Sequence, residues 1–277
     1  MKSMSTKTII AVTLLAIAAV FPGCSKDKSE RVVIKGSTTV LPITQKTAEA
    51  FREKTAISIT IEGSGSGNGI KALMDGSCDI ANSSREMKDS EFKSAAEKGL
   101  KVKEIAVALD MIVPIVHPSN PVKNITLNQL KGIYDGSISN WKQLGGKNEN
   151  IVVISRDTSS GTYEVWSEIV MKKADVRKDA LLQASNGAIV SAIAGNPRAI
   201  GYVGYGYLTD TIKALTVNGV EGSIPNAKSG KFPISRKLYK YVNELKYSAE
   251  AQKYMDFVMG PEGQKLVQEA GFIPVNE

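Results

Sequence analysis

The sequence has few of the residues on which most catalytic and metal sites depend. Its 277 residues include one histidine, His117, and two cysteines, Cys24 and Cys78. A hydrolytic nucleophile needs a base beside it, and a zinc site needs several His, Cys or carboxylate ligands. No cluster of His and Cys and no regular spacing of carboxylates occurs along the chain. We therefore expect no metal ion, no cofactor and no enzymatic activity.

Runs of positive charge are also missing. Lys and Arg number 35 against 28 Asp and Glu, a formal net charge of +7, but they are scattered and are not interleaved with aromatic residues. Nucleic-acid-binding proteins gather basic residues on one surface, so we expect no nucleic-acid partner. A moderate positive balance suits an anionic ligand without identifying it.

A single hydrophobic span occurs in the sequence, and it lies at the N-terminus. Lys2 and Lys7 precede the apolar stretch Ile9 to Val20. That stretch is too short to span a bilayer comfortably, and a basic region followed by a short apolar region is typical of an export signal. We expect residues 1–23 to be a signal peptide, and the mature protein to be extracytoplasmic.

The signal ends at Phe21-Pro22-Gly23-Cys24, which resembles a bacterial lipobox, although Phe21 stands where Leu is usual. We expect lipidation of Cys24, which would anchor the protein to a bacterial membrane through a polar tether over residues 24–31. The alternative is an ordinary secretory signal with an incidental cysteine. With Cys24 lipidated, only Cys78 remains, so no intramolecular disulfide can support the fold.

Strand and helix patterns alternate along the mature chain, which predicts an α/β fold. Ile57, Ile59 and Ile61 alternate with polar residues as in a half-buried strand, and Pro42 fits the first turn of a helix. Asn186 is expected to cap a helix. Expected strands cover residues 32–34, 57–62, 78–82, 102–117, 151–155 and 200–208. Expected helices begin near Pro42 and cover residues 70–75, 89–98, 162–171, 187–194, 249–259 and 261–269.

The stretch 102–117 is unusually long for a strand and is almost entirely apolar from Ile105 onward. We expect its middle, around Ala108 to Met111, to cross between two lobes, and the strand 200–208 to return. This assigns residues 32–108 and 216–277 to lobe 1 and residues 109–215 to lobe 2. A ligand cleft is expected between the lobes, where α/β proteins commonly bind ligands.

Small hydroxyl and glycine residues separate a strand from a helix at three places. These turns are Gly36 to Thr39, Gly63 to Gly69 and Arg156 to Thr162. The first backbone N–H groups of a helix are unpaired and carry partial positive charge, so each turn is a candidate anion site. Arg156 can hold two oxygens of an anion at once. Three such turns meeting at one point would surround a small oxyanion with donors.

These segments resemble the phosphate-binding proteins of phosphate ABC transporters. The resemblance rests on Gly36 to Pro42, the glycine run through Ala72, Asp79 to Arg85, Arg156 to Thr162 and Asn186 to Tyr207, in this order. It implies a two-lobed periplasmic-binding-protein fold that closes on inorganic phosphate, an ABC permease as partner, and a monomer. The phosphate ligands it implies are Thr38, Thr39, Ser66, Arg156, Ser160, Gly161 and Thr162.

One position departs from the family pattern. Ser84 stands where the best-known members have an aspartate that accepts the proton of hydrogen phosphate and so excludes sulfate. Ser84 stays a candidate ligand, and we expect Asp110 to be the substitute acceptor, with Arg85 beside it. The alternative is that Asp110 is only an ion-pair partner of Arg85.

Other functions remain open from the residues alone. The same fold could bind sulfate, molybdate or tungstate. A secreted phosphatase could use the same turns on a phosphoester, although the sequence offers no nucleophile with a metal or acid partner. A surface adhesin or sensor that kept the fold is a further alternative.

Overall fold

The computed structural model describes residues 31–276. The expected signal peptide, Cys24 and all of the expected tether except Arg31 lie outside the described residues. Between residues 31 and 276, no helix is both long and apolar enough to cross a membrane.

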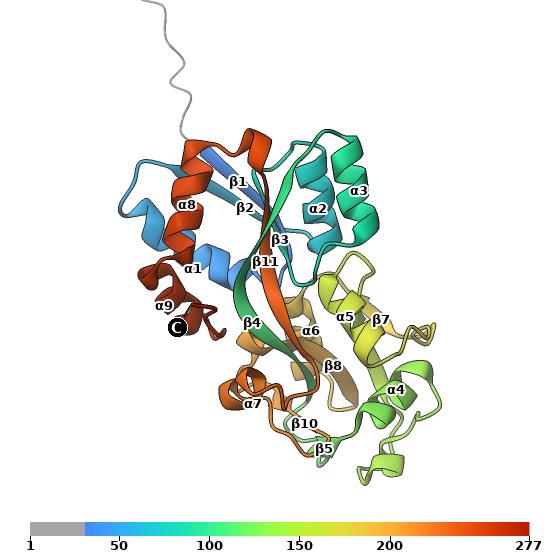
Figure 1. Cartoon of the computed structure of the whole chain (residues 1–277). Helices are drawn as coiled ribbons and strands as arrows, with labels where there is room; N and C mark the ends of the chain where they lie inside the picture. The colour runs from blue at the N-terminus through green and yellow to red at the C-terminus, as the bar shows by residue number, and fades with distance from the viewer. Residues whose placement is uncertain (1–30, 277) are drawn as a thin grey trace, which may run out of the picture.

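The expected α/β fold is confirmed (Figure 1). The described residues form a sheet of nine strands in the order β2-β1-β3-β11-β4-β8-β6-β7, with β9 paired to β4, and a two-stranded sheet of β5 and β10. The strands are β1 (Arg31–Gly36), β2 (Ser58–Gly63), β3 (Ile80–Ser83), β4 (Val102–Val116), β5 (Asn124–Ile125), β6 (Val152–Arg156), β7 (Leu181–Gln183), β8 (Ala199–Gly204), β9 (Lys213–Ala214), β10 (Thr216–Val217) and β11 (Ser235–Asn243).

Helices cover the sheet on both faces in the upper lobe of Figure 1, with α1, α8 and α9 on one side and α2 and α3 on the other. The α-helices are α1 (Leu41–Arg52), α2 (Ser66–Met74), α3 (Asp89–Glu97), α4 (Leu127–Asp135), α5 (Gly161–Ile169), α6 (Asn186–Ala194), α7 (Ile224–Lys228), α8 (Ala249–Met259) and α9 (Pro261–Glu269). Short 3-10 helices are η1 (Trp141–Leu144), η2 (Tyr205–Tyr207) and η3 (Glu244–Lys246).

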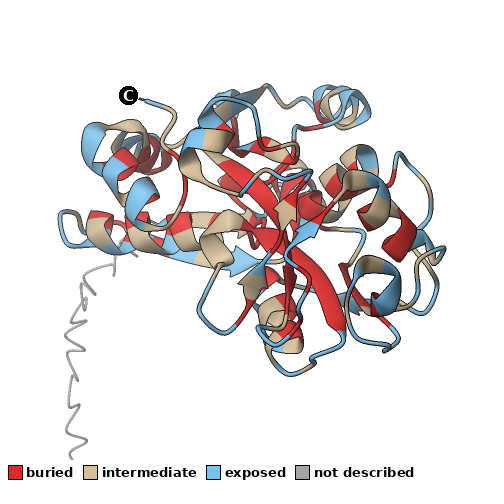
Figure 2. Cartoon of the chain, turned by 90° about the horizontal axis from the view of Figure 1, so that it is seen from below, coloured by how far each residue is buried: buried red, intermediate tan, exposed pale blue. Residues whose placement is uncertain are grey.

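The hydrophobic core is divided between two lobes. Two clusters draw their residues from positions 32–108 and 238–272, on the two faces of the first half of the sheet. A third cluster draws on positions 111–234, with Ile273 added. Figure 2 shows the buried residues concentrated along the central strands, with exposed residues on the outer helices. Each lobe therefore has its own core.

Strand β4 changes its pairing partner along its length. Its residues up to Met111 pair antiparallel with β11, whereas Ile112 to Val116 pair antiparallel with β8. The long apolar strand thus belongs to both lobes, and the change of partner occurs between Met111 and Ile112. Figure 1 shows β4 and β11 running together from one lobe into the other.

The return passage lies later in the chain than the expected strand 200–208. That segment forms β8 and η2 within the second lobe, and Ile200 is part of its core. The chain returns at Ile234 and Ser235, where the Ile112 N–H donates to the Ile234 carbonyl over 2.8 Å. Val217 and Phe232, from the stretch 216–234 that we assigned to lobe 1, pack in the core of the second lobe. β11 is hard to detect in the sequence because buried Arg236 and Lys240 interrupt its apolar pattern.

Candidate anion-binding site

The first hydroxyl turn joins β1 to α1 and is fastened to the neighbouring strand β3. The Ser37 N–H donates to the Asn82 carbonyl over 2.9 Å. Gly36 has a φ of 130°, and a Cβ there would lie 2.2 Å from the Asn82 carbonyl oxygen. Only glycine fits so close to another backbone segment at this φ. The turn therefore presents Thr38 and Thr39 from a fixed position at the start of α1.

The second turn is shorter than expected, because α2 begins at Ser66 rather than at Ile70. Most of the glycine run lies in the first turn of the helix, where glycine serves close packing rather than flexibility. A Cβ on Gly69 would lie 2.6 Å from the Gly36 Cα, so the first two turns are in direct contact. Ser66, the first residue of α2, is fully buried.

The third turn follows β6 and comes from the second lobe. Ser160 caps α5, and its hydroxyl accepts a hydrogen bond from the Tyr163 N–H over 3.3 Å. The Gly67 N–H donates to the Ser159 carbonyl over 3.0 Å, which joins the second and third turns. The three turns thus meet where the two lobes are closed against each other.

The expected hydroxyl residues lie together in this contact between the lobes. The Thr39 and Thr162 hydroxyls are 2.9 Å apart, and the Ser66 and Ser84 hydroxyls are 3.3 Å apart. A Cβ on Gly161 would lie 2.5 Å from the Ser66 Oγ, so the start of α5 fits against lobe 1 only because it is glycine. All the expected hydroxyl residues are buried, namely Thr38, Thr39, Ser66, Ser84, Ser160 and Thr162.

Asn186 also belongs to this group, and the prediction that it caps a helix is wrong. Ser185, not Asn186, caps α6, and its hydroxyl accepts from the Ala188 N–H. The Asn186 side chain instead donates to the hydroxyls of Thr38 over 3.2 Å and Thr39 over 3.0 Å. A hydroxyl whose oxygen already accepts a hydrogen bond has its own proton left to donate. Asn186 therefore occupies an acceptor position on each threonine oxygen and leaves the hydroxyl protons to be donated elsewhere.

Arg156 is a buried cation with little compensating charge. Its side chain is 1% exposed, and among the described residues the one carboxylate within 4 Å is that of Asp157, at 3.8 Å. Its Nε and Nη2 atoms donate to the carbonyls of Gln183 and Ala184, whereas Nη1 has no hydrogen-bond partner within residues 31–276. Burial lowers the pKa of Arg156, and the charge of Asp157 opposes that shift only in part.

Asp110 pairs with Arg236, which the sequence did not single out. Arg236 Nη2 and Nε donate to Asp110 Oδ2 over 2.8 and 3.0 Å, and Arg236 Nη2 lies 3.4 Å from the Thr39 hydroxyl. Burial raises the pKa of Asp110, while the charge and hydrogen bonds of Arg236 lower it. The Asp110 Oδ1 accepts from the Tyr205 N–H over 2.9 Å. Arg236 is therefore a second cation at the site, but its charge is already paired with Asp110.

Arg85 is not the partner of Asp110 that we expected. It donates to Glu91 and Glu164 instead. The reason is long-range geometry: β11 pairs Arg236 directly with Asp110 on β4, whereas Arg85 leaves β3 toward α3 and α5. Whether Asp110 accepts a proton from a ligand stays a prediction, although its bonds to Arg236 and Tyr205 occupy most of the acceptor capacity of a carboxylate.

Comparison with known proteins supplies the family. A model of the PBP superfamily domain matches residues 25–262. The phosphate-binding protein PstS of Borreliella burgdorferi is 31% identical over 97% of this chain and 99% of its own length. PstS of Staphylococcus saprophyticus is 35% identical over 86% of this chain and 78% of its own length.

A solved structure from Clostridium perfringens, assigned to a phosphate ABC transporter substrate-binding protein and containing bound phosphate, is 37% identical. It covers 89% of this chain and all of its own, with a TM-score of 0.84. The crystal structure of PstS from Borrelia burgdorferi is 30% identical over 90% of this chain and 100% of its own, with a TM-score of 0.59.

Proposed function

The chain belongs to the phosphate-binding substrate-binding proteins of phosphate ABC transporters, and we propose that it captures inorganic phosphate between its lobes and delivers it to a membrane permease. The proposal rests mainly on the environment of Arg156. Its side chain is buried, and its Nη1 atom has no hydrogen-bond acceptor among the described residues. A buried charge without a partner is costly, and a bound anion would offset that cost. The family supports a binding role rather than a catalytic one.

The remaining contacts follow from the buried hydroxyl groups. Phosphate is small and has four oxygens, so a cradle of N–H and O–H donors can enclose it completely. Lobe 1 would supply the first turn, the start of α2 and the end of β3, and lobe 2 would supply Arg156 and the start of α5. The proposed phosphate ligands are Thr38, Thr39, Ser66, Ser84, Arg156, Ser160, Gly161 and Thr162.

We propose that Asp110 acts on the ligand through Arg236. The carboxylate fixes the guanidinium beside Thr39 and neutralises its charge. Arg156 then remains as the cation whose charge is available to the dianion. Because the site combines one available cation with neutral donors, selectivity would depend on how many donors and acceptors face each oxygen.

Capture between two lobes implies a hinge. The two passages, at Met111–Ile112 and Ile234–Ser235, lie side by side and could bend together when the lobes separate. Small-angle scattering with and without saturating phosphate tests this directly. A smaller radius of gyration with phosphate is expected, and identical profiles would contradict capture by closure.

The lipid anchor and the location rest on the sequence. We propose an extracytoplasmic monomer held at a bacterial membrane by lipid on Cys24. Mass spectrometry of the membrane-extracted protein should find an N-terminal lipidated Cys24, and Cys24→Ala should release the protein from the membrane fraction. Membrane retention of that variant, or an unmodified Cys24, would contradict the anchor.

A further inference from the structure

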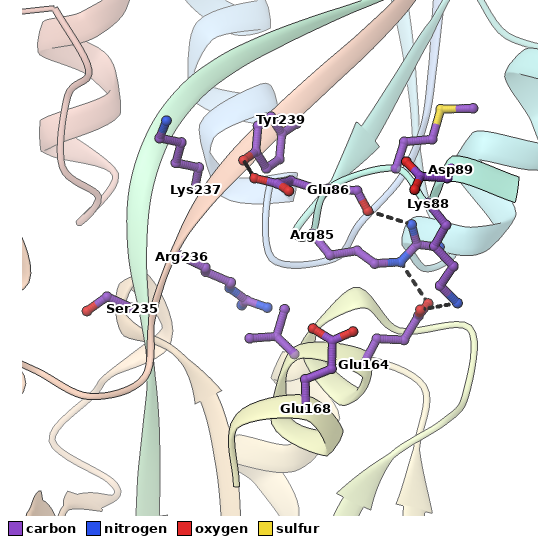
Figure 3. A pocket seen from close by; sticks show the side chains of 12 residues that line it. Arg85, Glu86, Lys88, Asp89, Glu164, Glu168, Ser235, Arg236, Lys237 and Tyr239 are labelled. Carbon is purple, nitrogen blue, oxygen red and sulfur yellow. Dashed lines mark hydrogen bonds and ion pairs between the residues drawn. The ribbon is translucent and has the colours of Figure 1, made fainter. Parts of the chain in front are cut away.

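An ion-pair network joins the lobes directly beside the candidate ligand site. Arg85 follows Ser84 in lobe 1, and Glu164 lies two residues after Thr162 in the first turn of α5, in lobe 2. Arg85 Nε donates to Glu164 Oε1 over 2.8 Å, and Lys88 forms an ion pair with Glu164 Oε2. Figure 3 shows Arg85 and Lys88 converging on Glu164 from the opposite lobe. Two of the proposed ligand segments, at Ser84 and at Thr162, are thus followed closely by a residue that reaches the other lobe.

Arg85 is held in place by its own lobe. Its Nη1 and Nη2 atoms donate to the two carboxylate oxygens of Glu91 over 2.7 and 2.8 Å. Burial by itself lowers the pKa of Arg85, but its bonds and charge interactions with Glu91 and Glu164 raise it above the ordinary value. Opening the lobes would leave the Arg85–Glu91 pair intact and remove only Glu164. The guanidinium therefore stays oriented and compensated, ready to meet Glu164 again.

The network lies on the wall of a cavity of about 590 Å³ that both lobes line. Figure 3 shows Glu168, one turn after Glu164, on the wall of the same cavity. The Arg85 and Glu164 side chains are 7% and 16% exposed, so the pair is shielded but not sealed from water. A partly shielded ion pair contributes more stabilising free energy than an ion pair at the surface, and it does not carry the full desolvation cost of a deeply buried pair.

We propose that Arg85 and Glu164 form a latch between the lobes that slows phosphate release without touching phosphate. The inference rests on the proposed function, because closure on phosphate is what brings the pair together. Glu164 is solvated when the lobes are open and bonded to Arg85 when they are closed, so the pair stabilises only the closed form. Arg85 and Glu164 are therefore positioning residues for binding.

The test compares Glu164→Gln with wild type and with Glu168→Gln in stopped-flow measurements of phosphate binding. Both variants remove one negative charge from the same helix, but within residues 31–276 no ion pair involves Glu168. Glu164→Gln should release phosphate about fivefold faster, with an unchanged association rate, and the effect should shrink at high salt. Glu168→Gln should match wild type. Equal release rates for Glu164→Gln and wild type would overturn the latch.

A second readout keeps the latch separate from phosphate binding. Hydrogen exchange in the segment 64–69 reports the bond from the Gly67 N–H to the Ser159 carbonyl across the lobes. Exchange there should be faster in Glu164→Gln than in Glu168→Gln, and equal protection would overturn the latch. If wild type fails to bind phosphate, the proposed function fails, and the exchange comparison still decides whether the pair holds the lobes together. Should Glu164→Gln fold poorly, Lys88→Gln, at a half-exposed position, should speed release in the same direction by a smaller factor.

Discussion

Replacing Arg156 should separate ligand binding from stability. In Arg156→Met the side chain keeps most of its volume but loses the charge and the bonds to the Gln183 and Ala184 carbonyls. Phosphate would lose its main charged partner in a dry site, which costs about 2–5 kcal/mol, or about 30-fold to 5,000-fold in affinity. The variant should therefore bind phosphate very weakly.

Without phosphate, the same change should cost little. Removing a 1% exposed guanidinium whose nearest carboxylate is 3.8 Å away relieves a desolvation penalty. This gain opposes the loss of two hydrogen bonds, so the free energy of unfolding should change by no more than about 1 kcal/mol.

The assays are calorimetric titration with phosphate and urea unfolding of phosphate-stripped protein, with Arg198→Met as control. Arg198 is an exposed residue of the same lobe, and its replacement changes the net charge equally. A phosphate affinity of Arg156→Met within about threefold of wild type would show that Arg156 does not hold the ligand, since experimental scatter accounts for such a difference.

Three further predictions follow from individual contacts. Gly161→Ala places a Cβ 2.5 Å from the Ser66 Oγ, so it should hold the lobes apart and weaken phosphate binding at least about tenfold; calorimetry with unchanged affinity would contradict this contact. Asp110→Asn leaves Arg236 buried without its partner and should lower the free energy of unfolding by about 3–5 kcal/mol in urea, without creating sulfate binding; measurable sulfate binding would instead identify Asp110 as the proton acceptor. Burial lowers the pKa of Lys240 to about 7 in the folded protein, whereas an unfolded lysine has a pKa of about 10.4. Between these two pH values the unfolded chain therefore binds more protons than the folded protein. Stability relative to Lys240→Met should accordingly rise between about pH 7 and 10, and a flat difference in thermal melts would show that Lys240 stays charged.

The sequence predicted the elements whose signals are local. Alternation at Ile57, Ile59 and Ile61, the proline near the start of α1, and the long apolar run of β4 all identify elements by period or length alone. The three hydroxyl turns were found for the same reason, because each follows a strand and opens a helix. Their convergence followed from the family resemblance, and the structure brings these residues together.

Side-chain contacts between residues far apart in the sequence could not be predicted. Asp110 and Arg236 are neighbours because β4 and β11 pair in one register, and no local pattern reveals that register. β11 itself was missed because Arg236 and Lys240 make it look exposed, although both are buried. Asn186 was taken for a helix cap because side chains of this type commonly cap helices, and only the closed lobes show it bonded to Thr38 and Thr39.

We propose above all that the buried site between the lobes binds phosphate. The most direct measurement is calorimetric titration of the phosphate-stripped protein with phosphate, arsenate, sulfate and molybdate. We expect one phosphate bound per chain, with arsenate competing for the same site because of its similar shape and protonation, and no measurable heat from sulfate or molybdate. Tighter binding of sulfate or molybdate than of phosphate, or no phosphate binding at all, would contradict it.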